Sequence, residues 1–506
     1  MKFNSLIKKS DTIVNHEGEL AYRLSPEMEL YTAVVTASLS DKFYEAGSEQ
    51  MNRILELVSK VSPEYVAKLA VYTRTEMHLR SVPLLLVVAL AKAHSGDDLV
   101  ARTVEHVVQR ANEIMELLMC YQLLNPSEGR KKLGRLSHQI QCGLQRAFNN
   151  FDEYQFAKYN RGNLEVKLRD ALFIVHPKAK DDAQQSIFNK IVEDKLSVPY
   201  TWETELSALG QKKYDNEQDR KDAFREKWEE LISSRKVGYM ALLRNLRNML
   251  VSGVSPVLID QVCAYLSSPQ NVLKSKQLPF RYLSAYREID SIDNVSTTMV
   301  LSALEDAMKA SADNISGFDE DTRTLVACDV SGSMWSLVSQ RSKVRLFDIG
   351  IVLAMLFKNR CKQVVTGMFG TEWKVFNYPN GNILPAITEM ERHEGEVGYS
   401  TNGYKVVKWL LKDDVVVDKV LIFTDCQMWN SQGDGNTFAQ LWSQYKRRVP
   451  KAQLYLFDLA GYGQMPLRME QDDVFLIGGW SDRIFDVISD LQNANTVVNA
   501  INNIEL

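Results

Sequence analysis

Oxygen-bearing side chains follow an apolar run in the stretch "TLVACDVSGSMWS", which extends from Thr324 to Ser336. Asp329, Ser331 and Ser333 stand there at alternate positions, so one carboxylate and two hydroxyls are close together in the chain. Side chains of these types can ligate a metal ion, attack a phosphate or cap the next turn of the chain. The stretch alone does not decide between the three roles.

Two further oxygen donors stand at comparable places later in the sequence. Asp425 ends the apolar run "LIFTD", and Thr401 lies in the loop sequence "GYSTNGY" before a helical pattern. If the apolar runs are parallel strands, Asp329 and Asp425 reach the same rim, because ligands bind at the carboxyl ends of such strands. Hydroxyls with only two carboxylates suit Mg²⁺ or Mn²⁺, which keep water ligands and leave a position for an incoming acidic group. We therefore expect a metal site made of Asp329, Ser331, Ser333, Thr401 and Asp425.

Two other interpretations of the same residues explain less. Capping by Asp329 and its serines leaves Asp425 and Thr401 without a role. A phosphohydrolase with Asp329 as nucleophile usually carries a second carboxylate two residues later, where this chain has Ser331. The sequence shows no Ser–His dyad and no P-loop, and His393 is the histidine nearest these motifs. Catalysis is therefore not indicated, and we expect a protein that is not an enzyme.

Basic side chains form a second group with possible chemistry. The whole chain has a net charge of −4, yet residues 129–287 carry 27 Lys and Arg against 18 Asp and Glu. In "KVGYMALLRNLRNML", Arg244 and Arg247 fall on a different helical face from the apolar stripe. Their guanidinium forks match phosphate oxygens. The segment "GRKKLGR" adds four more cations: Arg130, Lys131, Lys132 and Arg135. These clusters predict salt-sensitive RNA binding with little sequence preference, and the alternative is an ordinary solvated surface.

The elements that carry these residues differ between the two parts of the chain. From about Ser25 to Ala310, apolar residues recur at helical spacing, which predicts short antiparallel helices stacked as a HEAT-like solenoid. After the acidic segment "SADNISGFDEDTR", strand-like runs alternate with amphipathic helices, which predicts a doubly wound parallel sheet. We expect a multidomain protein with an all-α repeat domain at 1–315 and an α/β domain at 322–506.

Cellular location is predicted from cysteines and hydrophobic runs. The six cysteines are scattered without a CxxC pair, which is typical of reduced thiols in a cytosol. The start of the chain lacks the apolar core of a secretory signal, and the most apolar run, 82–91, is about half of what spans a bilayer. The expectation is a soluble cytoplasmic protein without membrane contact.

Several of the helical segments resemble the TROVE module of telomerase-associated, Ro and vault proteins. The segments are "YVAKLAVYTRTEMHLRSVPLLLVVAL", "FAKYNRGNLEVKLRDALFIVHPKAKD", "WEELISSRKVGYMALLRNLRNML" and "LPFRYLSAYREI". The C-terminal part, with "DVSGSM", Thr401 and Asp425, resembles a von Willebrand factor A domain with a metal-ion-dependent adhesion site. A TROVE module followed directly by an A domain is similar to the layout of the Ro ribonucleoprotein autoantigen family and its prokaryotic relatives.

The resemblance implies a ring of HEAT-like repeats closed by the A domain. Proteins of this family bind small non-coding Y RNAs on the outer face and accept single-stranded 3′ ends of misfolded RNAs in the central hole. By their place in the motifs "KYNR" and "IVHPKA", Lys158, Arg161 and His176 would lie at the Y RNA surface.

Two functions follow from these observations. The first is a non-catalytic RNA-binding protein of Ro type that acts in RNA quality control or ribonucleoprotein assembly, with an exoribonuclease or another protein as a possible partner of the A domain. The second is a protein-interaction scaffold whose A domain grips an acidic side chain of a partner through its metal ion. A single chain can close such a ring, so we expect a monomer.

Overall fold

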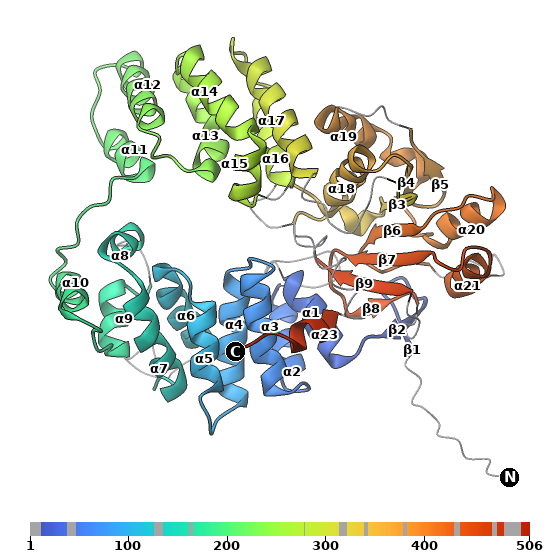
Figure 1. Ribbon diagram of the computed structural model, residues 1–506, viewed down its shortest axis with the longest axis horizontal. Helices are drawn as coiled ribbons and strands as arrows, with labels where there is room; N and C mark the ends of the chain where they lie inside the picture. Colours follow the sequence, from blue (N-terminus) through green and yellow to red (C-terminus); the bar gives the residue numbers. More distant parts are fainter. Residues whose placement is uncertain are drawn as a thin grey trace. The chain divides into compact units, whose positions relative to one another are not determined.

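The chain folds into two compact units, each built from separate stretches of sequence (Figure 1). The computed structural model describes residues 12–37, 47–125, 135–160, 165–277, 279–312, 321–338, 343–377, 382–429, 436–467, 473–479 and 497–506. One unit, called the sheet unit below, comprises Met1–Gln50 and Glu205–Val497. The other, called the helical unit, comprises Met51–Thr204 and Val498–Leu506. The predicted sequence boundary between 315 and 322 stays a prediction.

The helical unit consists of short helices packed as stacked pairs. Contacts join α3 to α5, α4 to α6 and α5 to α7, so each of these helices packs on the one next but one in the chain, as in a solenoid. The helices are α2 (Gly47–Val58), α3 (Pro63–Thr75), α4 (Ser81–Ala93), α5 (Leu99–Val107), α6 (Ala111–Leu124), α7 (His138–Ala147), η1 (Phe148–Asn150), α8 (Glu153–Tyr159), α9 (Leu168–Val175), α10 (Asp182–Val192) and α23 (Val497–Asn502). The next helix, α11 (Trp202–Gly210), begins in this stretch of sequence and has most of its residues in the sheet unit.

Local sequence explains how these helices begin and how their polar groups are satisfied. Ser62 caps α3, where its hydroxyl accepts a hydrogen bond from the backbone N–H of Tyr65 at 3.2 Å and Pro63 takes the first helical position. A buried ion pair between Arg74 of α3 and Glu113 of α6, with an N–O distance of 2.8 Å, links two helices inside the stack. Removing either partner would leave a buried charge, so the pair fixes which helices meet.

A second helical group and a helix from the N-terminal part belong to the sheet unit. Tyr239 joins three of its helices, because its hydroxyl donates to the carbonyl oxygen of Leu266 at 2.6 Å and lies 3.0 Å from the hydroxyl of Tyr282. The helices are α1 (Pro26–Val35), α12 (Glu217–Ser233), α13 (Tyr239–Ser252), α14 (Pro256–Ser267), α15 (Pro269–Ser275), α16 (Pro279–Ile289) and α17 (Thr297–Ala312).

The six-stranded sheet has the order β5-β4-β3-β6-β7-β9. Its strands are β3 (Thr324–Asp329), β4 (Val364–Phe369), β5 (Trp373–Val375), β6 (Lys419–Thr424), β7 (Gln453–Asp458) and β9 (Val474–Gly478). All neighbouring strands are parallel except the edge strand β5, which is antiparallel to β4. The prediction of a helical part followed by a doubly wound α/β part is therefore confirmed, with one antiparallel edge that is common in such folds.

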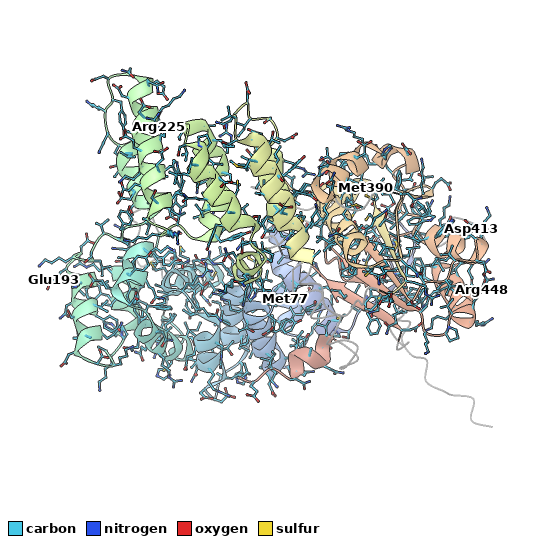
Figure 2. All side chains as sticks on the ribbon, turned by 45° about the horizontal axis from the view of Figure 1, so that its top comes forward. Met77, Glu193, Arg225, Met390, Asp413 and Arg448 are labelled. Atoms are coloured by element: carbon cyan, nitrogen blue, oxygen red, sulfur yellow. The ribbon has the colours of Figure 1, made fainter. Side chains whose placement is uncertain are left out.

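Helical segments alternate with the strands of this sheet along the chain. They are η2 (Gly332–Trp335), α18 (Leu346–Arg360), α19 (Ile383–Arg392), η3 (Glu394–Val397), α20 (Tyr404–Lys412) and α21 (Phe438–Arg448). The buried helix α18 packs on β3 and β4, and α1 packs on β9. The helices α20 and α21 end close together, because the guanidinium of Arg448 donates to the carbonyl oxygen of Leu411. Figure 2 labels Asp413 and Arg448 at these two helix ends.

A small antiparallel sheet was not expected from the sequence. The strands β1 (Thr12–Val14), β2 (Leu20–Arg23) and β8 (Gln464–Met465) pair in the order β1-β2-β8. Strands of two to four residues carry too little alternation to be recognised in a sequence. No helix among the described residues is both long and apolar enough to cross a membrane.

Candidate functional site

The two predicted carboxylate ligands lie at the carboxyl ends of two adjacent strands. Asp329 is the last residue of β3, Asp425 follows directly after β6, and the two strands pair in parallel register. Every residue of both strands is buried, so the carboxylates come from a rigid layer. The placement of these two residues at one rim agrees with the prediction.

Hydrogen bonds fix the first carboxylate and its serines. Asp329 Oδ2 accepts from the hydroxyl of Thr424 at 2.7 Å, and Asp329 Oδ1 accepts from the backbone N–H of Ser331 at 2.9 Å. The hydroxyl oxygens of Ser331 and Ser333 lie 3.3 Å apart, and both side chains are buried. The structure therefore brings both hydroxyls to the side of Asp329.

Two oxygens of the predicted site are buried and have no hydrogen-bond partner among the described residues. They are Asp425 Oδ2 and Thr401 Oγ1. The other oxygen of Asp425 accepts from the backbone N–H of Gln427 at 3.1 Å. A buried acceptor left unpaired costs about 1–3 kcal/mol, which a bound cation would offset. The two oxygens thus fit a divalent ion.

The electrostatics of the site also favour a cation. Burial, reinforced by the charge of Asp425, raises the pKa of Asp329 to about 7, although Thr424 and Ser331 oppose the shift. Burial likewise raises the pKa of Asp425, whereas the side-chain hydroxyl of Ser333 opposes this rise. Two buried carboxylates disfavour each other's ionised form, and a divalent ion between them would reverse that preference.

Hydroxyls are essential to this candidate centre. Among the described residues, no group of three or more His, Cys, Asp or Glu side chains lies together as a metal site. The candidate donors are instead two carboxylates and three hydroxyls, which fit Mg²⁺ or Mn²⁺ rather than zinc.

Two aromatic side chains and an arginine form a cluster next to the predicted hydroxyl donors in the chain, and the sequence did not predict them as part of the site. Trp335 comes two residues after Ser333 and lies 6.4 Å from the ring of Tyr399, centroid to centroid. The guanidinium of Arg345 stands 4.7 Å from the centroid of Trp335. Tyr399 is 53% exposed, so this rim is open to a partner. The sequence signal was the position of each aromatic residue two places from a predicted ligand.

The N-terminal hairpin also contacts the segment after Asp425. The side-chain amide of Asn15 donates to the carbonyl oxygen of Met428 at 2.9 Å, and the backbone N–H of His16 donates to Gln427 Oε1 at 2.9 Å. These residues are more than 400 positions apart in the chain, so sequence patterns could not indicate the contact.

The predicted Y RNA residues belong to the helical unit. Lys158 is half-buried in the last turn of α8, with its ammonium 5.8 Å from the ring centroid of Tyr159. His176 is exposed and ends α9 in the left-handed conformation, with a φ of 51°. Arg135 is exposed as well. Four other predicted cations lie outside the described residues: Arg130, Lys131, Lys132 and Arg161.

Amide side chains of α7 and η1 hold the loop that contains His176. Gln145 Nε2 donates to the carbonyl oxygen of Val175 at 3.0 Å. Asn149 Nδ2 donates to the carbonyl oxygen of Lys178 at 2.9 Å, and Asn149 Oδ1 accepts from the backbone N–H of Lys180 at 2.9 Å. This basic loop is therefore fixed on a helix rather than free in solution.

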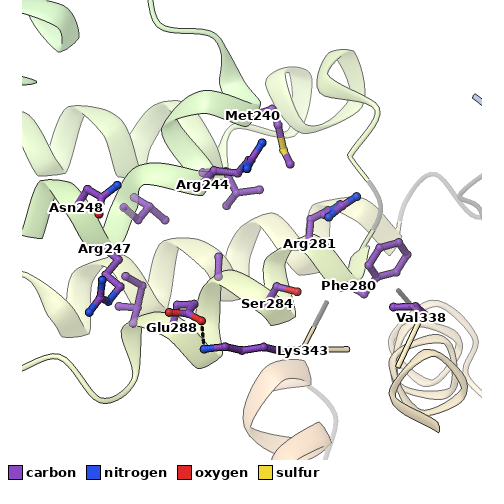
Figure 3. A pocket seen from close by; sticks show the side chains of 14 residues that line it. Met240, Arg244, Arg247, Asn248, Phe280, Arg281, Ser284, Glu288, Val338 and Lys343 are labelled. Atoms are coloured by element: carbon purple, nitrogen blue, oxygen red, sulfur yellow. Dashed lines mark hydrogen bonds and ion pairs between the residues drawn. The ribbon is translucent and has the colours of Figure 1, made fainter. Parts of the chain in front are cut away.

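Arg244 and Arg247 lie on the exposed face of α13 in the sheet unit, as the helical pattern predicts. The apolar stripe on the other faces is buried: Leu242, Leu243, Leu246, Met249 and Leu250. The two arginines line a cavity of about 560 Å³, which also has walls from α16 and from residues 338 and 343 (Figure 3). The cavity itself was not predicted.

Comparison with known proteins gives the chain a family. The model of the TROVE domain matches residues 32–224 and 192–345. Telomerase protein component 1 of Mus musculus is 24% identical over 349 residues, and that of Rattus norvegicus is 22% identical over 348. Each alignment covers 53% of this chain but only 13% of the relative, so the chain spans a small part of these proteins.

A solved structure matches the fold over most of the chain. The crystal structure of the Deinococcus radiodurans Ro (RSR) protein has a TM-score of 0.61 and 17% identity, with 94% of this chain and 99% of that chain covered. The match supports the fold described above. Since the TROVE model covers more than half of the sequence, the chain belongs to the TROVE domain family.

Proposed function

We propose that this protein is a non-catalytic RNA-binding protein of Ro type that acts in RNA quality control or ribonucleoprotein assembly. Membership of the TROVE family supports the coarser role, RNA binding in a ribonucleoprotein. The proposed ligands are a small non-coding, Y-like RNA and the single-stranded ends of misfolded RNA. The positions of both RNAs relative to the ring expected from the resemblance stay a prediction.

The exposed arginine pair of α13 carries the proposal. Neither Arg244 nor Arg247 forms an ion pair with a carboxylate among the described residues, whereas many other exposed cations of the chain do. Cations on a globular surface usually face nearby carboxylates or solvent, and an unpaired cluster in a hollow favours an anionic partner. A phosphate backbone supplies such charge without requiring base recognition.

A filter-binding titration tests the proposal. The probe is a structured RNA with a single-stranded 3′ tail, titrated at about 50 and 200 mM salt, with an unrelated acidic protein as control. We expect binding that is tighter than for the control and that weakens steeply with salt, because phosphate contacts release counterions. Binding equal to that of the control protein, or binding without salt dependence, would contradict the proposal.

The Y-like RNA surface is tested separately. Replacing Lys158 and Arg161 with Glu should weaken binding of a Y-like stem-loop RNA, since each reversal replaces an attraction to phosphate with a repulsion. The same double reversal at Lys190 and Lys195, two partly exposed lysines of the helical unit, is the charge-matched control. Unchanged affinity in the first variant would refute this surface, even if other RNAs still bind.

The metal site is a proposal of the same kind. We expect Mg²⁺ or Mn²⁺ to be held by Asp329, Ser331, Ser333, Thr401 and Asp425, with one coordination position left for an acidic group. The buried unpaired oxygens of Thr401 and Asp425 support it. Calorimetry should show Mn²⁺ binding that Asp329→Ala abolishes, and a retained signal in a folded variant would refute the site.

A second function is favoured by the rim of this site. Trp335 and Tyr399, each two residues from a predicted hydroxyl donor, form a cluster with Arg345 that offers stacking and a positive charge to an acidic peptide. A metal-dependent scaffold of this kind, with an exoribonuclease or another protein as partner, is compatible with RNA binding elsewhere. It predicts that partner capture requires the divalent ion and is lost in chelator, whereas RNA binding is not.

A further inference from the structure

The cavity beside α13 combines cationic and apolar walls. Two facing helices supply most of it, with Arg244 and Arg247 on α13 and Arg281 and Ser284 on α16 (Figure 3). Leu243, Leu246, Phe280 and Ile289 lie buried beneath them. A volume of about 560 Å³ falls within the range of about 300–1,000 Å³ of pockets that take small ligands.

Positive charge in the cavity is not balanced by its own carboxylate. Glu288 lines the wall, but it forms an ion pair with Lys343. Arg244, Arg247 and Arg281 form no ion pair with any described carboxylate. Burial, together with the nearby charge of Arg244, lowers the pKa of Arg281, so these two guanidiniums lie close enough to disfavour each other's charge. An anion with several acceptor oxygens would relieve that repulsion.

The mouth of the cavity offers apolar surface at the same place. Met240 and Val338 are half-buried side chains that line it from α13 and from the segment after η2. Val338 is held in position because its backbone N–H donates to the carbonyl oxygen of Val344 at 3.0 Å. Ser284 adds a hydroxyl on the α16 side. A ligand therefore meets guanidinium groups and an apolar wall within one small space.

We propose that this cavity binds a single nucleotide of a single-stranded RNA, with its phosphate between Arg244 and Arg281 and its base against Met240 and Val338, while Arg247 stands about one helical turn away for the next phosphate. This inference rests on the proposed RNA-binding function and adds a defined site to it. Guanidinium groups beside an apolar wall favour a nucleotide over other anions. A lone phosphate would bind the guanidiniums but leave the apolar wall exposed to water.

Binding of a fluorescently labelled, unstructured 12-nucleotide RNA tests the site in the full chain. The variant carries R244Q, R247Q and R281Q, and the control carries R220Q, K221Q and R225Q on α12, where Figure 2 labels Arg225. Both variants lose three positive charges from helices of the sheet unit. We expect affinity to fall by about tenfold or more in the cavity variant only, because charge-assisted hydrogen bonds are lost. The salt slope should shrink by about 1.4, since a single strand contributes about 0.7 per neutralised phosphate and the three arginines would contact two phosphates.

Crosslinking and competition give readouts that do not depend on affinity alone. A 4-thiouridine RNA should crosslink to peptides that contain Met240 or Phe280 in the wild type and in the α12 control. Adenosine monophosphate should compete with the RNA at lower concentration than inorganic phosphate does, because it also contacts the apolar wall.

The outcomes separate this site from the broader function. If the wild type binds RNA but the two triple variants bind equally well, the cavity assignment is overturned and the RNA-binding function stands. Crosslinks confined to other helices would have the same meaning. Competition by inorganic phosphate as strong as by adenosine monophosphate overturns the base contact. If the wild type itself does not bind RNA, the proposed function fails. Equal circular dichroism spectra and melting temperatures of the two variants show that folding is not the cause.

Discussion

At the scale of single residues, buried oxygens without partners are the most informative feature of the molecule. Strand ends predicted that Asp329 and Asp425 would share a rim, and the structure places them there. The unpaired state of Asp425 Oδ2 and Thr401 Oγ1 depends on side-chain packing, which no spacing in the sequence reveals. The candidate donors could therefore be predicted from residue types, but the presence of buried, unpaired oxygens that suit a cation could not.

The two serines allow a test that spares the fold. Because Ser331 and Ser333 contact each other through their hydroxyls, replacing both with Ala should change stability little. We expect the S331A/S333A variant to bind Mn²⁺ at least about tenfold more weakly, since loss of a positioned metal-site oxygen commonly has such an effect. Mn²⁺ should raise the melting temperature of the wild type but not of this variant, because a ligand stabilises only the state that binds it.

Ser336 provides the matched control for that experiment. It ends η2 close to the same segment but is not one of the five predicted donors. Ser336→Ala should keep the Mn²⁺ affinity and the metal-dependent melting shift of the wild type. Equal Mn²⁺ binding by S331A/S333A and the wild type would exclude both hydroxyls as ligands.

The cavity arginines show the limit of prediction at this scale. Arg244 and Arg247 were found because three-residue spacing on one helix is visible in the sequence. Arg281 and Lys343 were not, since they join the cavity through the packing of α13 on α16 and through a later loop. Contacts between distant segments leave no periodic signal.

At the scale of secondary-structure elements, side-chain amides of α7 and η1 hold the loop after α9. Gln141 and Gln145 stand four residues apart on one face of α7, and Asn149 follows four residues later in η1. All three donate to carbonyl oxygens of the loop between Val175 and Lys178. The four-residue spacing of these amides could be read from the sequence, but the loop to which they donate could not.

Asn149→Ala should loosen this loop selectively. The backbone N–H of Lys180 would lose the side-chain oxygen that accepts it, and the carbonyl of Lys178 would lose a donor. We expect amide hydrogen exchange at Lys180 to accelerate by about fivefold or more, corresponding to about 1 kcal/mol for a lost hydrogen bond. Asn150→Ala, the neighbouring exposed amide, is the control. Unchanged exchange at Lys180 would show that other contacts hold the loop.

One guanidinium links α16 to two helices that accompany the sheet. Arg287 donates to both oxygens of Asp348, at 2.9 and 3.0 Å, and also pairs with Glu391. Asp348 is fully buried and also accepts from the backbone N–H of Arg345. Burial raises the pKa of Glu391 to about 7, with Arg287 opposing and Asp348 reinforcing the shift, while the interactions with Arg287 keep the pKa of Asp348 low.

This arrangement predicts that stability falls as the pH rises from about 4.5 to 7. In that window the folded chain keeps the proton on Glu391 and the unfolded chain has lost it, so deprotonation favours unfolding. Asp348 contributes stability that is lost only at more acidic pH, below the window. Burial also raises the pKa of Glu394, so its deprotonation lowers the stability in the same direction as that of Glu391.

Glu391→Gln removes the titration while it keeps the side-chain shape. The melting temperature of the variant should vary less between pH 5 and 7 than that of the wild type. Glu372→Gln, an exposed carboxylate paired with Lys405, should leave the wild-type profile unchanged. Identical pH profiles for Glu391→Gln and the wild type would mean that Glu391 is ionised in the folded chain throughout this range.

At the scale of the whole molecule, both compact units are assembled from distant parts of the chain. The N-terminal strands pair with β8 in the sheet unit, and the C-terminal segment belongs to the helical unit. Periodicity distinguished the helical part from the α/β part because it is a local property. It could not assign the two ends of the chain, since their partners are hundreds of residues away.

The C-terminal segment should therefore stabilise helices that lie near the start of the sequence. Lys68 of α3 donates to the carbonyl oxygen of Asn502 at 2.8 Å, and Ile501 is completely buried. Replacing Ile501 with Ala should cost about 2–5 kcal/mol, the usual range for a buried isoleucine. Because the side chain belongs to the helical unit, amide exchange should accelerate in α3 and α5, while β3 and β6 of the sheet unit keep their protection.

Asn502→Ala, which changes an exposed side chain and keeps the backbone carbonyl, should leave both units as they are. Faster exchange in β3 and β6 to the same extent would show that the two units unfold together, whereas wild-type exchange in α3 would show that the segment does not support that helix.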